Sequence, residues 1–227
     1  MKLIVPVCVM TLVAILANDA SAQRTYDTLP NMMDHHRQLV SKFRSEPVQK
    51  GRVIFLGNSI TEVGNWRQLL GDTTILNRGI AGDVTFGILQ RLDEITRHQP
   101  RRLFLLIGVN DLYKQVPDEV IIENIFTIVH RVKAASPKTE IFVTSILPLN
   151  PGFKNFPAGY DKGEHAVAIN TQLQKYGERL GYRFLNIHPS FTDEQGRLIE
   201  KFSVDGLHLN PAGYEHWAAW LRKEKLF

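Results

Sequence analysis

The chain has 227 residues, of which 44% are hydrophobic and 22% charged, so it is long and apolar enough to bury a core, which excludes a disordered protein. The formal net charge of +4 is small and the basic residues are not clustered, so it does not indicate a nucleic-acid partner. The single cysteine, Cys8, excludes a disulfide framework and a multi-cysteine metal site.

The first 22 residues read as a secretory signal peptide. A lysine precedes the apolar run Leu3–Ala17, and Ala20–Ala22 has the small-residue pattern of a cleavage site. The run is shorter than the ~20 residues needed to span a bilayer, which argues against stable membrane insertion. We predict cleavage near Ala22 and export to the periplasm or the medium. Residues 23–227 then form a single domain without cysteine, so a catalytic nucleophile would not be a thiol.

The rest of the chain alternates short apolar runs with segments of helical periodicity. The runs, whose successive residues are apolar as in strands buried on both faces, are 53–56, 74–76, 103–107, 141–144 and 184–187. The predicted helices are 32–44, 85–97, 118–135, 164–180 and 211–223. This alternation predicts a doubly wound α/β fold, whose ligands bind beyond the carboxyl ends of the strands.

Polar segments stand where such a fold would bring them together. Three follow the first three predicted strands and one lies near the C-terminus: 57–61, 77–85, 108–111 and 205–210. Each contains residue types that can carry acyl-transfer chemistry.

Ser59 could act as a nucleophile if a base removed its proton, although a serine after a strand is more often a helix N-cap. His208 is a candidate base, and Asp205 three residues earlier could orient its ring. The other reading of this Asp-x-x-His spacing is a solvated loop with an Asx-turn.

Gly82 and Asn110 could supply donors to an oxyanion, the glycine from its backbone N–H and the asparagine from its side-chain amide. They could equally be a turn glycine and a capping residue. The spacing of Gly79 and Gly82 matches no phosphate-loop pattern, so a flavodoxin-like nucleotide-binding protein is disfavoured.

The order and spacing of four blocks resemble the GDSL-like lipase/esterase family, also called SGNH hydrolases, over about residues 53–221. The blocks are 55–61 (FLGNSIT), 77–83 (NRGIAGD), 107–111 (IGVND) and 205–214 (DGLHLNPAGY). The resemblance implies a three-layer α/β/α sandwich with a five-stranded parallel sheet. One departure is that Asn58 and Ile60 replace the Asp and Leu that give the family its name.

The resemblance also implies roles for single residues. Ser59 would be the nucleophile, His208 the base and Asp205 its orienting carboxylate. The oxyanion donors would be the backbone N–H groups of Ser59 and Gly82 and the side chain of Asn110. No metal or cofactor is implied.

The stretch 148–162 is long for an α/β connection, and such connections are often functional. It follows a predicted strand, so Phe153, Phe156 and Tyr160 could line the alcohol side of a substrate pocket. The alternative is a loop packed on itself.

These observations favour an exported serine esterase that removes short acyl groups, acetyl above all, from a small-molecule or glycan ester such as an acetylated carbohydrate. A lysophospholipase or thioesterase of the same family is the alternative enzyme. A glycan-binding module without catalysis is a third reading, against which Ser59, Asp205 and His208 argue. The fold alone does not separate these activities.

Overall fold

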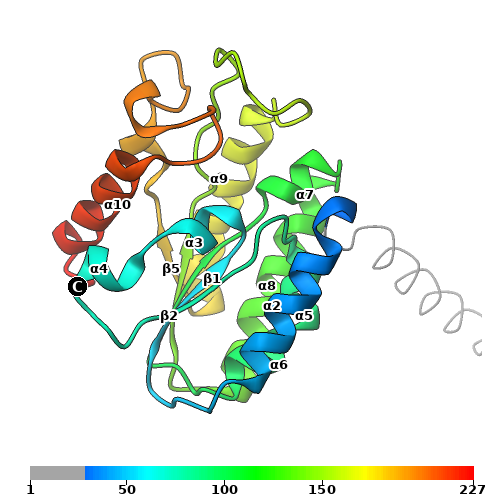
Figure 1. Cartoon of the computed structure of the whole chain (residues 1–227), viewed down its shortest axis with the longest axis vertical. Coiled ribbons are helices and arrows are strands. Elements are labelled where there is room, and N and C mark those ends of the chain that lie inside the picture. Colours follow the sequence, from blue (N-terminus) through cyan, green and yellow to red (C-terminus); the bar gives the residue numbers. More distant parts are fainter. Residues whose placement is uncertain (1–28) are drawn as a thin grey trace, which may run out of the picture.

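The structure is a computed structural model that describes residues 29–227, so the predicted signal peptide lies outside the described residues. Five parallel strands form one sheet in the order β2-β1-β3-β4-β5 (Figure 1). The strands are β1 (Val53–Gly57), β2 (Leu76–Gly79), β3 (Arg102–Leu106), β4 (Glu140–Thr144) and β5 (Arg183–Leu185). The predicted fold class, a three-layer α/β/α sandwich around a five-stranded parallel sheet, is confirmed.

Helices cover both faces of the sheet (Figure 1). The longer ones are α2 (Met33–Ser45), α8 (Asp118–Ala135), α9 (Gly163–Leu180) and α10 (Pro211–Lys223). The shorter ones are η1 (Pro30–Met32), α3 (Ser59–Val63), α4 (Trp66–Leu70), α5 (Thr85–Gln90), α6 (Leu92–Thr96), α7 (Val109–Tyr113), η2 (His188–Phe191) and η3 (Glu200–Phe202). Over residues 29–227, none of them has the length and hydrophobicity needed to cross a membrane.

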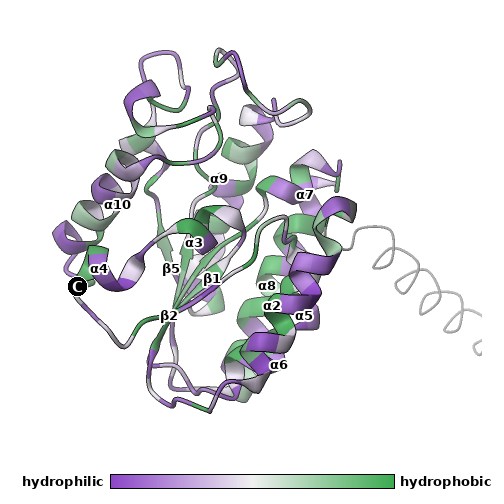
Figure 2. Cartoon of the chain, in the orientation of Figure 1, coloured by the Kyte–Doolittle hydropathy of each residue, from purple (hydrophilic) through white to green (hydrophobic). Residues whose placement is uncertain are grey.

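The two faces of the sheet bury separate cores, which explains why the strands are apolar at successive positions. Ile54 and Leu56 of β1 point into the core under α5, α6, α8 and α9, whereas Phe55 points into the core under α4 and α10. In Figure 2 hydrophobic and hydrophilic residues alternate along the helices, as expected when one side of each helix packs on the sheet. Phe55, Phe104 and Phe142 are register neighbours on β1, β3 and β4, and their rings stack at 4.8 and 4.7 Å between centroids.

Helices with clear end signals have the predicted bounds. The helices α8 and α10 coincide with the predicted segments 118–135 and 211–223. In α10, the side chain of Asn210 accepts a hydrogen bond from the Gly213 N–H, and Pro211 occupies the first turn, where its missing N–H costs nothing. Capping residues and proline therefore predict these boundaries well.

The single helix predicted over 85–97 is wrong, because the chain breaks at Arg91 into α5 and α6. Arg91 has φ −117° and turns its guanidinium into the protein, where it is 1% exposed. Its Nε donates to Asp83 Oδ2 at 2.9 Å, and a terminal nitrogen donates to the carbonyl oxygens of Arg78 and Gly57. These hydrogen bonds to a buried charge outweigh the continuity of one short helix.

The second strand is also displaced from its predicted position, since β2 is Leu76–Gly79 and not 74–76. Its polar residues are held by specific partners instead of by apolar burial. Asn77 donates to the carbonyl oxygens at the end of α3, and Arg78 pairs with Glu94 and Glu46. A pattern of apolar residues therefore could not predict this strand.

Candidate active site

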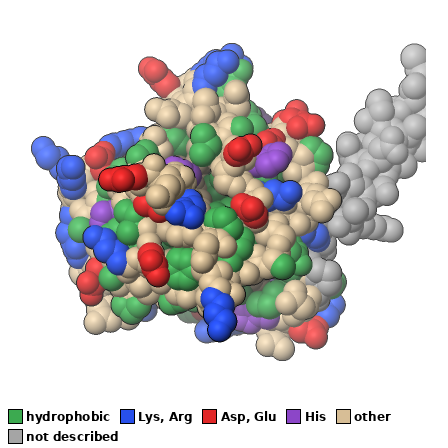
Figure 3. Space-filling view, turned by 90° about the horizontal axis from the view of Figure 1, so that it is seen from above, with side chains coloured by type: hydrophobic (Ala, Val, Ile, Leu, Met, Phe, Trp, Pro, Cys, Tyr) green, Lys and Arg blue, Asp and Glu red, His purple; other side chains and the backbone are tan. Residues whose placement is uncertain are grey.

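The candidate residues gather at the carboxyl edge of the sheet, beside the point where strand order reverses. The chain passes from β1 to β2 on one side and then to β3 on the other, which places the ends of β1 and β3 at this switch point. Figure 3 looks onto the top of the molecule as drawn in Figure 1, where acidic, basic and apolar side chains are interspersed without a large patch of one charge.

Ser59 is the first residue of α3, immediately after β1. Asn58, and not Ser59, is the N-cap, and its Oδ1 accepts from the Ile60 N–H at 3.0 Å. At Gly57 a Cβ would lie 2.2 Å from the carbonyl oxygen of Leu106, so only glycine allows β1 and β3 to approach this closely. Because Asn58 caps α3, the hydroxyl of Ser59 is not used for capping.

His208 lies between Ser59 and Asp205, in the irregular segment before α10. Its Nε2 is 3.1 Å from Ser59 Oγ, and its Nδ1 is 2.7 Å from Asp205 Oδ2. The other oxygen, Asp205 Oδ1, accepts from the backbone N–H groups of Leu207 at 2.9 Å and His208 at 2.7 Å. The Asx-turn considered for this spacing is thus present, and it leaves Oδ2 to the imidazole.

The environment of Asp205 keeps its carboxyl ionised. Burial on its own would raise its pKa, but the hydrogen bonds from the His208 ring and from the backbone N–H groups of His208 and Leu207 outweigh burial and lower the pKa below its ordinary value. A carboxylate at this place fixes the His208 tautomer with the proton on Nδ1, which leaves Nε2 as an acceptor.

Further hydrogen bonds hold the segment that carries His208 and the helix that carries Ser59. Ser203 Oγ donates to the His208 carbonyl oxygen and accepts from the Gly206 N–H, both at 2.8 Å. From α10, the Tyr214 hydroxyl donates to the carbonyl oxygen of Ile60 at 2.8 Å. The helix that carries Ser59 is therefore anchored to the element that follows His208.

Gly82 lies in the turn after β2, and Asn110 is the second residue of α7. Gly82 has φ +76°, and a Cβ there would lie 2.8 Å from the side chain of Met32 at the start of the described N-terminal segment. Asn110 is 3% exposed, and its Nδ2 donates to the carbonyl oxygen of Asp83 at 2.9 Å. This bond links the asparagine side chain to the residue after Gly82.

Asp111, which follows Asn110, is a buried carboxyl for which sequence analysis assigned no role. Its Oδ1 accepts from the hydroxyl of Thr85 at 2.6 Å, and its two oxygens accept from the Thr85 N–H. Burial raises the pKa of Asp111 to about 7, against the opposing effect of the Thr85 hydrogen bonds. The folded protein thus binds a proton here that the unfolded chain releases near pH 4.

This proton predicts a pH dependence of stability. Where the folded state binds more protons than the unfolded chain, the free energy of unfolding falls as pH rises. For Asp111 this fall is expected between about pH 4 and pH 7. Above pH 7 the group should cause no further change. We expect the free energy of unfolding of Asp111→Asn, relative to that of the wild type, to increase by ~2 to 4 kcal/mol from pH 4.5 to pH 7.5. Urea unfolding of both proteins at the two pH values measures this. The exposed substitution Asp34→Asn serves as the control, and a constant difference between wild type and Asp111→Asn would contradict the assignment.

A small apolar pocket is lined in part by chain neighbours of Ser59 and His208. It has a volume of about 10 Å³ and is lined by Asn58, Ile60, Leu106, Ile107, Val109, Ile146, Leu147, Pro148, Leu149 and Leu207. Four of these residues, Asn58, Ile60, Val109 and Leu207, are chain neighbours of the candidate site residues Ser59, Asn110 and His208.

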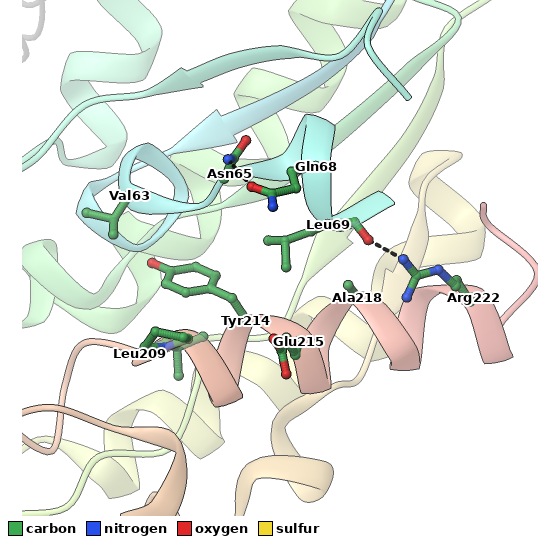
Figure 4. Close-up of a pocket in the computed structure, with 10 residues that line it drawn as sticks. Val63, Asn65, Gln68, Leu69, Leu209, Tyr214, Glu215, Ala218 and Arg222 are labelled. Carbon is green, nitrogen blue, oxygen red and sulfur yellow. Dashed lines mark hydrogen bonds between the residues drawn. The ribbon is translucent and has the colours of Figure 1, made fainter. Parts of the chain in front are cut away.

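A larger groove of about 550 Å³ lies between α4 and α10 (Figure 4). Leu69 and Gln68 face it from α4, and Tyr214 and Ala218 face it from α10. Neither Ser59, Asp205 nor His208 lines this groove or the small pocket, so we assign the chemistry to the hydrogen-bonded residues themselves.

Of the aromatic residues predicted to line a pocket from the loop 148–162, Tyr160 does not lie as expected. Tyr160 is buried in the core at 8% exposure, and its hydroxyl donates to Asn110 Oδ1 at 2.7 Å. Phe156 is partly buried against the same core. Tyr160 therefore does not line an open pocket, and its hydroxyl contacts the candidate oxyanion donor Asn110 from the core.

Comparisons with known proteins bear on the family and fold of the chain. The model of the GDSL-like Lipase/Acylhydrolase family matches residues 55–216. The rat (Rattus norvegicus) platelet-activating factor acetylhydrolase IB subunit alpha1 is 26% identical over 194 residues, covering 79% of this chain and 75% of the rat protein.

Two solved structures show the same architecture. A Streptococcus pneumonia protein described as a candidate platelet activating factor has 30% identity and a TM-score of 0.79, covering 96% of this chain and 99% of its own. A variant of an acetyl-xylooligosaccharide esterase from Geobacillus Stearmophilus has 15% identity and a TM-score of 0.64, covering 80% and 97%. The second likeness concerns the fold alone.

Proposed function

Since the chain belongs to the GDSL-like lipase/acylhydrolase family, we propose that it is a serine esterase that hydrolyses short-chain acyl esters, acetyl esters above all. The observation that carries the proposal is the continuous hydrogen-bonded line from Ser59 Oγ through the His208 ring to Asp205 Oδ2, with distances of 3.1 and 2.7 Å. A nucleophile, a base and an orienting group in this order are the requirements of acyl transfer through a covalent intermediate.

In the proposed reaction, His208 Nε2 takes the proton from Ser59 Oγ as Oγ attacks the ester carbonyl carbon. The oxyanion of the tetrahedral intermediate accepts from the backbone N–H groups of Ser59 and Gly82 and from Asn110 Nδ2. His208 then gives its proton to the leaving alkoxide, which departs as the alcohol and leaves Ser59 acylated. A water molecule, deprotonated by His208, attacks the acyl-enzyme, and collapse of the second intermediate returns the proton to Ser59 and releases the acid. Asp205 stays ionised throughout.

The small pocket supports the preference for short acyl groups. Its volume of about 10 Å³ is close to the room that one water molecule needs, and a methyl group is of similar size. Side chains of Ile60, Val109 and Leu207 would contact the third carbon of a longer acyl chain. Each methylene that is accommodated or refused in an apolar pocket changes specificity by roughly 10- to 200-fold.

Hydrolysis of p-nitrophenyl acetate, butanoate, octanoate and palmitate by residues 23–227 tests the proposal directly. We expect kcat/KM to be largest for the acetyl ester. A maximum at long acyl chains would support a lysophospholipase instead. If acetyl-CoA, assayed alongside, were hydrolysed and the p-nitrophenyl esters were not, the result would support a thioesterase. A folded protein that turns over none of them but binds glycans would support the non-catalytic module.

Truncating one wall of the pocket should change the chain-length preference. We expect Leu207→Ala to raise the ratio of butanoate to acetate kcat/KM by about 10-fold or more, because it removes three carbons from the pocket wall. The control is Leu221→Ala, which truncates a fully buried leucine of α10 that does not line the pocket. Equal ratios in both variants would show that this pocket does not receive the acyl chain.

The alcohol carrier in this proposal is a carbohydrate, and the protein acts after export. The openness of the site supports a bulky polar carrier, since the His208 side chain is 36% exposed. Acetate release from acetylated xylo-oligosaccharides, compared with release from a 2-acetyl phospholipid, distinguishes this carrier from the lipid suggested by the acetylhydrolase relatives.

A further inference from the structure

We infer that Tyr160 is a positioning residue for the reaction, because its hydroxyl sets the orientation of the Asn110 amide that faces the oxyanion. The inference rests on the proposed function, in which Asn110 is an oxyanion donor. Tyr160 belongs to the connection between β4 and α9, 50 residues away from Asn110 in the chain. It does not touch the reacting atoms itself.

The hydrogen bonds around Asn110 allow one orientation of its amide. The carbonyl oxygen of Asp83 can only accept, so the amide nitrogen must face it, and it does so at 2.9 Å. The amide oxygen then faces the Tyr160 hydroxyl at 2.7 Å, which donates to it. Burial raises the pKa of Tyr160 to about 12, so this hydroxyl keeps its proton across the working range of an esterase.

An amide NH₂ has two hydrogens, and this orientation assigns both. One hydrogen of Nδ2 is donated to the Asp83 carbonyl oxygen, and the second is available to a ligand. Without the Tyr160 hydroxyl, the oxygen of this buried amide loses a partner and the amide can rotate away. Preorganised donors stabilise an oxyanion because they need no reorientation during the reaction.

Tyr160 is itself held in place by the helix that carries Asn110. Its ring stacks on Tyr113 with 4.7 Å between centroids and 18° between planes. Asn110 and Tyr113 are three residues apart on α7 and lie on one face of that helix. Gly159 also packs on Tyr113, since a Cβ there would lie 3.0 Å from its ring. The stacking on Tyr113, which belongs to the same helix as Asn110, therefore helps to position the Tyr160 hydroxyl.

The test is Tyr160→Phe, which removes the hydroxyl and keeps the ring. With p-nitrophenyl acetate we expect kcat to fall about 10-fold while KM changes less than about 2-fold, as for the loss of one hydrogen bond that acts in the transition state. The matched control is Tyr182→Phe, which removes another buried hydroxyl, one that donates to the carbonyl oxygen of Leu173. Equal kcat losses in the two variants would mean a structural role and overturn the inference.

A double-mutant cycle with Asn110→Ala adds a readout that a structural role does not predict. If Tyr160 acts through Asn110, Tyr160→Phe changes kcat less than about 2-fold once Asn110 is alanine. Independent, multiplied losses would overturn the inference, as would a single Tyr160→Phe variant with wild-type kcat.

A covalent probe separates this inference from the proposed function. Ethyl p-nitrophenyl methylphosphonate places a phosphoryl oxygen where the oxyanion would lie, and its reaction with Ser59 is followed by intact-protein mass. We expect phosphonylation to slow about 10-fold in Tyr160→Phe. Wild-type protein that is phosphonylated but hydrolyses no acetyl ester would refute the proposed substrate while still measuring the effect of Tyr160. Equal labelling rates in wild type and Tyr160→Phe, or no labelling of either, would overturn the inference.

Discussion

Ser59→Ala is expected to lower kcat for p-nitrophenyl acetate by roughly 10⁴- to 10⁶-fold, the range for loss of a catalytic serine. The alanine keeps the backbone N–H at the start of α3 and the cap made by Asn58 Oδ1 on the Ile60 N–H, so the turn should persist. What disappears is the atom that His208 Nε2 contacts at 3.1 Å. Steady-state hydrolysis and the loss of acyl-enzyme mass after rapid quenching measure the effect.

The control for this variant is Ser190→Ala. Ser190 is a partly buried serine in η2, and its hydroxyl donates to the carbonyl oxygen of Ile187 at 2.9 Å. We expect its kcat to match the wild type. A Ser59→Ala protein that keeps more than about a tenth of the wild-type kcat would rule out Ser59 as the nucleophile, because a triad without its serine retains only the contribution of binding and the oxyanion donors.

Asp205→Asn should lower kcat by about 10⁴-fold with little change in fold. The reason lies in the two backbone N–H groups that Asp205 Oδ1 accepts, at 2.9 and 2.7 Å. These donors hold the amide oxygen of an asparagine and turn its NH₂ toward His208 Nδ1. The ring must then accept at Nδ1 and carry its proton on Nε2, so it donates to Ser59 and cannot act as its base.

Asp193→Asn is a matched control for this substitution. Asp193 Oδ1 also accepts from two backbone N–H groups, those of Gln195 and Arg197, at 2.9 and 2.8 Å, but among residues 29–227 its carboxylate pairs with Arg197 and with no histidine. We expect wild-type kcat for Asp193→Asn and a similar melting temperature for both variants. If the two variants kept the same activity, the carboxylate of Asp205 would have no part in setting the tautomer of His208.

Much of the fold follows from local patterns in the sequence. The bounds of α8 and α10 were predictable because Pro117 and Pro211 mark helix starts and a long apolar periodicity follows them. The strands β1, β3 and β4 were predictable because their side chains are buried on both faces. The break at Arg91 was not, because it depends on acceptors at Asp83, Arg78 and Gly57 that meet only in the folded chain.

The candidate site also contains residues that local sequence patterns reveal and others whose partners only the fold supplies. The blocks around Ser59, Asn110 and His208 are short motifs, so their residues could be singled out without a structure, and the fold brings Ser59 and His208 together. Tyr160 was singled out for the wrong reason. An aromatic residue in a long loop reads as exposed, and the partner of its hydroxyl, Asn110, leaves no periodic signal in the sequence.

The buried side chain of Arg91 couples segments that are far apart in the chain. Its guanidinium bonds at once to the end of β1, to β2 and to Asp83 in the turn after Gly82. Lysine has no planar fork and cannot satisfy these three acceptors together. The turns that bear Ser59 and Gly82 therefore cannot fluctuate open one at a time without leaving this cation unpaired, and their amides should exchange with solvent as one cooperative unit.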